Sequence, residues 1–397
     1  MEMKKLRIGL FGFGVVGQGL YDVIHKTKGI HAEIVKICVK QRDKVRPIPM
    51  DFFTFDKEDI LKDDSLDVVV ELIDNTDEAF SIVSEALSKG KAVVSANKRM
   101  IAEHFVELYN LQKARNVSFL YEASVCGSIP IIRNLEEYYD NDLLTTLEGI
   151  CNGTTNYILT KVAEENVSYA EALKGAQESG FAESNPTLDV KGFDAKFKLT
   201  LLLTHTFGVF VNHSDIFNFG IQNLTADDST YAREKGFRIK LIAHTFSQNG
   251  KIHAYVMPKF IRQNDMFYDV RNEFNAVQLE ASFSDKQFFS GKGAGSYPTA
   301  SAVLSDLSAL MYDYHYMYKK YNQRQENNNA GATFSNDLLL NVYMRYQDDN
   351  LLPELQFAEI DQQFISHEYK YVIGKVNLSR LHQLNLNDRD DIFLVRI

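Results

Sequence analysis

Two carboxylates and one lysine occur close together in the segment Glu183–Leu199, which has the sequence ESNPTLDVKGFDAKFKL. Asp194 and Lys198 are four residues apart, a spacing that places two side chains one turn apart on the same face of a helix. A proline-containing turn separates this pair from Glu183, so we expect the helix to begin near Asp189. The segment therefore predicts a cluster of two carboxylates and an ammonium group.

An ordinary surface ion pair would have the same spacing. Such a pair stabilises an exposed helix by about 0.2–0.5 kcal/mol and carries no chemistry. The apolar run LTLLLTHTFG follows directly, which favours a helix that is at least half-buried. A half-buried lysine with a carboxylate partner is a candidate general acid or base.

Composition excludes several classes of protein. The chain has 397 residues and a net charge of −10, with no basic block, so we expect no nucleic-acid partner. No apolar run approaches the roughly 18 residues that span a bilayer, so we expect no membrane partner and a cytoplasmic location. The three cysteines are widely spaced, which argues against a disulfide framework or a zinc site.

A glycine fingerprint lies near the N-terminus. It follows a predicted strand at 5–11, precedes a predicted helix that ends near residue 26, and consists of Gly12, Phe13, Gly14, Val15, Val16 and Gly17. Glycines permit a tight turn and close approach of the backbone to a diphosphate at the helix N-terminus. A second predicted strand at 33–39 completes the expected spacing. The pattern favours dinucleotide binding over a simple glycine-rich turn.

The end of the second strand carries cations where an NAD-specific site has a carboxylate. Asp or Glu at this position holds the ribose 2′-hydroxyl, whereas basic side chains suit a 2′-phosphate. The chain has Lys40, Gln41 and Arg42 there. NADP(H) is therefore the favoured cofactor and NAD(H) the second possibility, and an exposed basic turn would explain the same residues.

Alternating apolar runs and helical patterns predict a parallel sheet covered on both faces. Predicted strands at 66–73, 92–95 and 118–122 each end in a loop, at 74–76, 96–98 and 122–130. Ligands of such sheets bind beyond the carboxyl ends of the strands. Thr76 and Lys98 are therefore placed on the ligand side of the sheet.

The sequence pattern changes after Pro130. Predicted helices at 154–165 and 169–179 are followed by predicted antiparallel strands between 237 and 290. An apolar helix is predicted from Ala300 to about Tyr318, and a polar linker at Asn322–Asn329. The remaining residues predict a small α+β module. The predicted fold class is α/β, with a Rossmann-type parallel-sheet nucleotide-binding domain, an α+β substrate and oligomerisation domain, and the C-terminal module.

From about residue 5 to residue 318 the chain resembles homoserine dehydrogenase. The resemblance is carried by GFGVVG at 12–17, SANK at 95–98, YEASVCGSIPIIRNL at 121–135, CNGTTNYILTK at 151–161, FAESNPTLDVKGFDAKFKL at 181–199 and GAGSYPTASAVLSDL at 293–307. It implies the interconversion of L-homoserine and L-aspartate 4-semialdehyde with NAD(P)(H), in the branch that leads to threonine, methionine and isoleucine.

The same resemblance implies roles for individual residues. Lys198 is expected to be the acid/base residue at the reacting oxygen, and Lys98 to lie near the nicotinamide and share the proton relay. Asp194 and Glu183 are expected to bind the amino-acid substrate. Gly295 matches a glycine beside the nicotinamide, which implies that residues of about 291–320 return to the first domain, 1–130. The remaining predicted domains are 131–290 and 321–397.

A monovalent cation and an oligomer are also implied by the resemblance. The expected sodium ligands are the backbone carbonyls of Glu122, Val125, Gly127 and Ile129. The family forms dimers or tetramers through the sheet of its second domain, so a homodimer or homotetramer is expected. The C-terminal module lies where many members carry an ACT regulatory domain, and it lacks the expected glycine-bearing turn, so a degenerate ACT-like role is implied.

Two other functions remain open on the sequence. Cys126 could act as the nucleophile of an acylating semialdehyde dehydrogenase, which would require phosphate and form a thiohemiacetal. The chain could also be a non-catalytic NADPH-binding sensor on the same fold. No histidine lies near Cys126 in the sequence to act as its base, which disfavours the acylating enzyme, and the set of Glu183, Asp194 and Lys198 disfavours the sensor.

Overall fold

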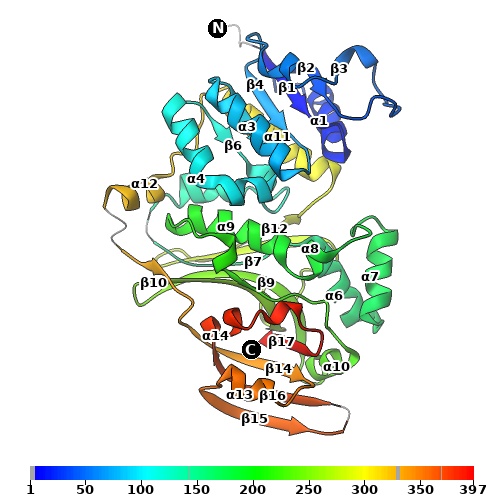
Figure 1. Ribbon diagram of the computed structural model, residues 1–397, viewed down its shortest axis with the longest axis vertical. Helices are drawn as coiled ribbons and strands as arrows, with labels where there is room; N and C mark the ends of the chain where they lie inside the picture. The colour runs from blue at the N-terminus through cyan, green and yellow to red at the C-terminus, as the bar shows by residue number, and fades with distance from the viewer. Residues whose placement is uncertain (1–4, 142, 328–330, 368) are drawn as a thin grey trace. The chain divides into compact units, whose positions relative to one another are not determined.

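The computed structural model describes residues 5–141, 143–327, 331–367 and 369–397. The chain forms two compact units, the first made of Met1–Tyr138 and Lys292–Tyr318 and the second of Tyr139–Gly291 and Lys319–Ile397. Figure 1 shows the elements of both. No helix in the described ranges is long and apolar enough to cross a membrane.

The first unit is built on a six-stranded parallel sheet of order β3-β2-β1-β4-β5-β6. Its strands are β1 (Leu6–Phe11), β2 (Ala32–Cys38), β3 (Phe53–Thr54), β4 (Val68–Glu71), β5 (Ala92–Ser95) and β6 (Phe119–Leu120). The strand order reverses between β1 and β4, and a nucleotide binds at such a switch point in doubly wound sheets. The predicted Rossmann-type sheet is confirmed.

Helices lie between these strands and after them in the chain. They are α1 (Val15–Lys26), α2 (Glu58–Leu61), α3 (Thr76–Ser88), α4 (Lys98–Arg115), α5 (Ile131–Arg133) and α11 (Ser296–Leu310), with short turns η1 (Met50–Phe52), η2 (Glu122–Ser124) and η3 (Asn134–Tyr138). Helix α1 packs against α11, and α3 against α4 (Figure 1). All four residues of β4 are buried, as expected for a strand covered on both faces.

The second unit contains a mixed eleven-stranded sheet of order β12-β11-β7-β9-β10-β17-β14-β16-β15, with β8 and β13 paired to β10. Its strands are β7 (Leu144–Ile150), β8 (Phe217–Asn218), β9 (Phe237–Gln248), β10 (Lys251–Arg262), β11 (Phe274–Ala281), β12 (Asp285–Lys292), β13 (Thr333–Phe334), β14 (Leu339–Tyr346), β15 (Glu359–Ile365), β16 (Lys370–Asn377) and β17 (Ile392–Arg396). Residues 319–397 thus share a sheet with residues 139–291, and the independence of 321–397 as a module stays a prediction.

The helices of the second unit are α6 (Gly153–Glu165), α7 (Tyr169–Glu178), α8 (Thr187–Val190), α9 (Phe193–Phe207), α10 (Ala226–Glu234), α12 (Lys319–Glu326), α13 (Leu351–Leu355) and α14 (Leu378–Gln383), with turns η4 (His213–Asp215) and η5 (Leu386–Asp388). Helix α9 packs on β7, β9 and β10 (Figure 1). Every residue from Asp194 to Phe207 is buried, which is expected of a helix that is apolar on nearly all sides.

Three predicted boundaries are wrong. The helix expected to begin near Asp189 is two helices, because Gly192 adopts a left-handed φ of 79° and ends the first one. The helix expected to reach Tyr318 is α11, which ends at Leu310.

The linker predicted at Asn322–Asn329 is largely helical, since its residues up to Glu326 belong to α12; 328 and 329 lie outside the described residues. The physical reason is a tertiary contact. Lys320 Nζ donates to the carbonyls of His205 and Thr206, and Arg324 Nε donates to that of Phe207. These groups satisfy carbonyls at the end of α9.

Candidate active site

Lys198 lies on α9 with its ammonium group held by two acceptors. Its Nζ donates to Asp194 Oδ2 at 2.7 Å and to the backbone carbonyl of Cys151 at 2.7 Å. Lys198 is 8% exposed and Asp194 6%. The alternative of a solvated surface pair is therefore wrong. A charged pair in such surroundings interacts more strongly than one in water, because little solvent screens it.

Asn152 joins this pair to a second carboxylate. Its Nδ2 donates to Asp194 Oδ2 at 2.9 Å and to Asp189 Oδ1 at 2.7 Å, while its Oδ1 accepts from Thr155 N at 2.8 Å and caps α6. One buried amide thus fixes two carboxylates and the start of a helix. We name Cys151, Asn152, Asp189, Asp194 and Lys198 the Lys198 network.

The sequence missed Asn152, Asp189 and the Cys151 carbonyl. The available signal was the sequence Asn-Gly-Thr-Thr at 152–155, which is typical of a helix N-cap. An N-cap assignment gives the asparagine a structural role and does not indicate that its amide reaches another helix. Residues 152 and 194 are brought together only by the packing of α9.

Glu183 does not join this network among the described hydrogen bonds. It is exposed, in the loop between α7 and α8. Its backbone carbonyl accepts from Gln177 Nε2 at 3.1 Å. Of the predicted cluster, Asp194 and Lys198 are hydrogen-bonded to each other, and Asp189 rather than Glu183 shares the amide of Asn152 with Asp194.

A hollow of about 560 Å³ lies at the carboxyl ends of β1, β2 and β4 in the first unit. Gly12, Phe13 and Gly14 line it. Gly12 has a φ of 93°, and a Cβ there would lie 2.5 Å from the carbonyl oxygen of Leu72. A Cβ on Gly17 would lie 2.5 Å from the carbonyl oxygen of Gly12. Gly12 and Gly17 therefore allow backbone contacts that no other residue permits.

The start of α1 lies directly after this turn. Val15 and Val16 are its first two residues, and no acidic residue occurs in its first turn. Ser296 Oγ donates to the carbonyl of Val15 at 2.8 Å. Gly295, with a φ of 115°, stands at the start of α11. Residues from both ends of the first unit therefore meet beside the glycine turn.

The basic residues of the hollow differ in part from those predicted. Lys40 lines it and forms an ion pair with Glu78 at 2.5 Å. Arg42 is not among the lining residues and lies over the ring of Phe55, 4.6 Å from its centroid. The lining cations that the sequence analysis did not name are Lys44, Arg46 and Lys57.

Thr76 and Lys98 are the first residues of α3 and α4. The preceding residues, Asn75 and Asn97, cap the two helices through their side-chain oxygens. Below them Glu71 is fully buried and accepts from Ser95 Oγ at 2.5 Å and Ile73 N at 2.7 Å. These bonds connect the loops after β4 and β5.

Comparisons with known proteins agree over most of the chain. Two family models match, "Homoserine dehydrogenase" at residues 130–308 and "Homoserine dehydrogenase, NAD binding domain" at residues 12–122. Homoserine dehydrogenase of Bacillus subtilis (strain 168) is 39% identical over 318 residues, which are 78% of this chain and 73% of the relative.

This chain belongs to the homoserine dehydrogenase family.

Solved structures extend the similarity to the whole chain. A homoserine dehydrogenase from Thiobacillus denitrificans matches with a TM-score of 0.82 and 27% identity over 99% of this chain and 98% of that one. That of S. aureus matches with a TM-score of 0.72 and 29% identity over 99% of each. Since coverage is nearly complete, the C-terminal segment of this homoserine dehydrogenase has counterparts there.

Membership of the family makes the chain an oxidoreductase with a nucleotide-binding domain, acting on an amino-acid substrate. It favours the dehydrogenase reading over the acylating enzyme and the sensor. The position of Cys126 is consistent with this result, since the residue is fully buried within a loop that has a φ of 54° there. A nucleophilic thiol needs access to its substrate.

The loop predicted to hold sodium is tightly built in this homoserine dehydrogenase. Glu122 Oε1 and Oε2 accept from Ile132 N and Arg133 N, each at 2.9 Å. Burial raises the pKa of the Glu122 carboxyl to about 7. A Cβ on Gly127 would lie 2.6 Å from the backbone of Gly293, so this residue must be glycine.

Asp306 lies against the same loop. Its Oδ2 accepts from Glu122 N at 3.0 Å, and its Oδ1 is buried without a hydrogen-bond partner. Burial raises the pKa of the Asp306 carboxyl well above its usual value. An orphaned carboxylate oxygen beside a loop of carbonyls suits a cation.

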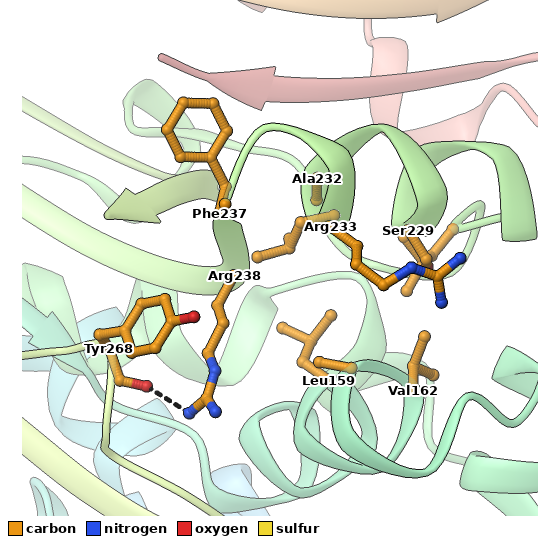
Figure 2. A pocket seen from close by; sticks show the side chains of 12 residues that line it. Leu159, Val162, Ser229, Ala232, Arg233, Phe237, Arg238 and Tyr268 are labelled. Carbon is orange, nitrogen blue, oxygen red and sulfur yellow. Dashed lines mark hydrogen bonds between the residues drawn. The ribbon is translucent and has the colours of Figure 1, made fainter. Parts of the chain in front are cut away.

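A smaller cavity of about 160 Å³ lies in the second unit, walled by α6, α10 and the start of β9. Figure 2 shows Leu159 and Val162 on α6, with Arg233 and Arg238 beside the cavity. Arg238 donates to the carbonyl of Tyr268 at 2.8 Å, and Arg233 is also hydrogen-bonded to the protein. The cavity is lined by apolar side chains and two arginines, and its lining residues are separate from the Lys198 network.

Proposed function

We propose that Lys198 is the general acid and base of this homoserine dehydrogenase. Reduction of an aldehyde places negative charge on its oxygen, and an ammonium group there stabilises that charge and donates the proton. A bound nicotinamide supplies the hydride. The observation that carries the proposal is the burial of the Lys198 ammonium between Asp194 and the Cys151 carbonyl.

The network gives Lys198 the properties that this role needs. Asp194 at 2.7 Å favours the ammonium form before reaction. The two fixed acceptors hold Nζ in one position, which lowers the cost of reaching the transition state. In the oxidation of homoserine, the same nitrogen takes the hydroxyl proton back by microscopic reversibility.

Asp194 and Glu183 are proposed to bind the substrate ammonium group. Glu183 supports this assignment through an exposed carboxylate, and Asp194 through its place beside the reacting lysine. Lys98 is proposed to share the proton relay because it begins a helix at the carboxyl end of β5, the edge where ligands of such sheets bind.

NADP(H) is proposed as the preferred cofactor, with NAD(H) as the second possibility. The residues fit a dinucleotide, because the Gly12 turn admits backbone approach and cations line the hollow. Lys40, Lys44 and Arg46 supply positive charge near the end of β2, where a 2′-phosphate is recognised in this fold.

A monovalent cation, sodium, is proposed in the 122–129 loop, held by the carbonyls of Glu122, Val125, Gly127 and Ile129. The orphaned Asp306 Oδ1 supports a positive charge nearby. In this role the ion stabilises the loop and takes no step of the reaction.

Self-association as a homodimer or homotetramer is also proposed. Strand β15 ends the sheet of the second unit, and all seven of its residues are exposed. An exposed edge strand that carries Ile360, Phe364 and Ile365 is a surface that proteins usually cover. The cytoplasmic location stays a prediction.

The proposal is tested by following the absorbance of reduced nicotinamide with L-homoserine and NADP+ or NAD+. We expect homoserine-dependent reduction of NADP+ that needs neither phosphate nor a thiol. Phosphate-dependent oxidation that alkylation of Cys126 abolishes would favour the acylating enzyme. Cofactor binding without turnover would favour the sensor.

A further inference from the structure

The turn between α8 and α9 is held by a residue from the far end of the chain. Asn387, in η5, donates from Nδ2 to the carbonyl of Lys191 at 2.9 Å. Its Oδ1 accepts from Gly220 N at 3.1 Å and from Gln222 Nε2 at 3.1 Å. One side-chain amide therefore bridges the α8–α9 turn and the 220–222 loop.

Further hydrogen bonds fix the same turn. Lys191 O accepts a second hydrogen bond from Asn218 Nδ2 at 2.8 Å, and Val190 O accepts from Ile221 N at 2.7 Å. A Cβ on Gly220 would lie 2.0 Å from Val190 O, so the two backbones touch. The turn cannot shift without breaking bonds to this loop or to Asn387.

The position of the turn decides the geometry of the Lys198 network. Asp189 precedes Lys191 on α8, and Asp194 follows it on α9. Both carboxylates accept hydrogen bonds from the amide of Asn152. Movement of the turn therefore changes the distance between the two carboxylates and, through Asp194, the place of the Lys198 ammonium group.

We propose that Asn387 is a positioning residue for the reaction, through which the C-terminal segment completes the substrate site. The proposal rests on the role of Lys198 given above. It assigns a catalytic consequence to residues beyond 318, which lie outside the two family models that match the chain. A side-chain amide meets both needs at once, because its NH2 group donates to Lys191 O while its oxygen accepts from Gly220 N.

Two substitutions of Asn387 change its hydrogen bonds while keeping a side chain of similar size. Asn387→Asp keeps the shape but replaces the donor with a carboxylate that faces a carbonyl oxygen. Asn387→Leu removes donor and acceptor together. The matched control is Asp388→Ala, since Asp388 pairs with Lys191 Nζ at 2.9 Å but its side chain is 78% exposed, and exposed ion pairs contribute little.

The experiment measures kcat and KM of the full chain for homoserine and for NADP+, thermal unfolding, and the pH dependence of kcat. We expect both Asn387 variants to lose about 10–100-fold in kcat, with a changed pH profile and with the KM for NADP+ unaltered. Asp388→Ala should behave as wild type. A displaced catalytic group accounts for a loss confined to kcat and its pH dependence.

Two results would overturn the proposal. In one, folded Asn387 variants retain kcat within about twofold of wild type. In the other, both variants lose cofactor binding and thermal stability together with turnover, which would show that Asn387 only stabilises the fold. Lys198→Met, assayed in parallel, tests the assignment on which the proposal rests: if it stays active, the Lys198 role fails whatever Asn387 does.

Discussion

The two units build their functional regions in different ways. The nucleotide hollow of the first unit is made largely of backbone, with glycines at close contacts, and with lysine and arginine side chains around it. The Lys198 network of the second unit is made mainly of side chains, most of them buried, that hydrogen-bond to one another. The difference teaches that the first can be recognised from local sequence, whereas the second exists only after α6, α8 and α9 pack.

Because the Lys198 network depends on specific side chains, we expect the loss of its lysine to have the largest effect on turnover. Lys198→Met should reduce kcat by at least about 100-fold, because positioned general acids contribute about 10²–10⁴-fold. The affinity for NADPH should stay the same, since the nucleotide hollow is built from the first unit. Steady-state kinetics and fluorescence titration with NADPH measure the two effects. A kcat above about a tenth of wild type would rule out the role.

The next largest effect is expected at Asn152. Asn152→Ala leaves the buried Asp194 and the half-buried Asp189 without their shared donor, and we expect kcat/KM for homoserine to fall about 10–100-fold. The control is Ser168→Ala, which removes the exposed N-cap of α7 in the same unit and should cost about 1 kcal/mol of stability without loss of activity. Equal kinetic losses in the two variants would show that Asn152 acts only as a cap.

A substitution in the glycine turn should weaken the binding of the cofactor and leave that of homoserine unchanged. Gly12→Ala places a methyl group 2.5 Å from Leu72 O at a φ of 93°, and the backbone must move at a cost of about 1–3 kcal/mol. We expect the KM for NADP+ to rise about tenfold, with the KM for homoserine unchanged. Loss of homoserine affinity alone would contradict the separation of the two sites.

Cofactor choice depends on smaller effects. Arg46→Ala removes a cation that lines the hollow, and we expect the ratio of kcat/KM for NADP+ to that for NAD+ to fall about tenfold. Arg42→Ala is the matched control, since Arg42 lies over Phe55 and outside the lining residues. A larger effect from Arg42 would restore the assignment made from the sequence.

The two units should also respond to pH in opposite directions. Burial raises the pKa of Glu71 and of Glu122 to about 7 from 4.5, so between about pH 4.5 and 7 the folded first unit binds more protons and loses stability as pH rises. Burial lowers the pKa of Lys240 to about 7 from 10.5 and that of His244 to about 3 from 6.5. In those windows the unfolded second unit binds more protons, so its stability rises with pH.

Hydrogen exchange resolves this difference. From about pH 5 to 8, protection factors corrected for intrinsic exchange should fall in β4 and rise in β9, each by on the order of 1 kcal/mol. Parallel changes in both units would contradict the opposed responses. Glu71→Gln, which removes one titrating carboxyl, should flatten the response of β4.

Much of the first unit could be predicted from the sequence because its signals are local. The glycine fingerprint, the apolar strands and the helix starts at Thr76 and Lys98 depend on neighbours within a few residues. Arg42 shows the limit of this inference. Its position after β2 was identified, but stacking on Phe55 depends on a residue thirteen positions further along the chain.

The second unit was less predictable because its contacts are distant in sequence. The four-residue spacing of Asp194 and Lys198 was visible, but the partners of the pair lie more than forty residues away, at 151 and 152. The residues of α12 lack an apolar face, and carbonyls of α9 explain why they form a helix. Residue types alone carry no signal for such contacts.

The most direct measurement of the central claim is a crystal structure of the ternary complex with L-homoserine and NADP+. The account predicts that the Lys198 ammonium nitrogen lies about 2.6–3.2 Å from the homoserine hydroxyl oxygen. The same nitrogen should keep its hydrogen bond to Asp194. A homoserine hydroxyl out of reach of Lys198 in that complex, with another side chain in contact with it, would contradict the account.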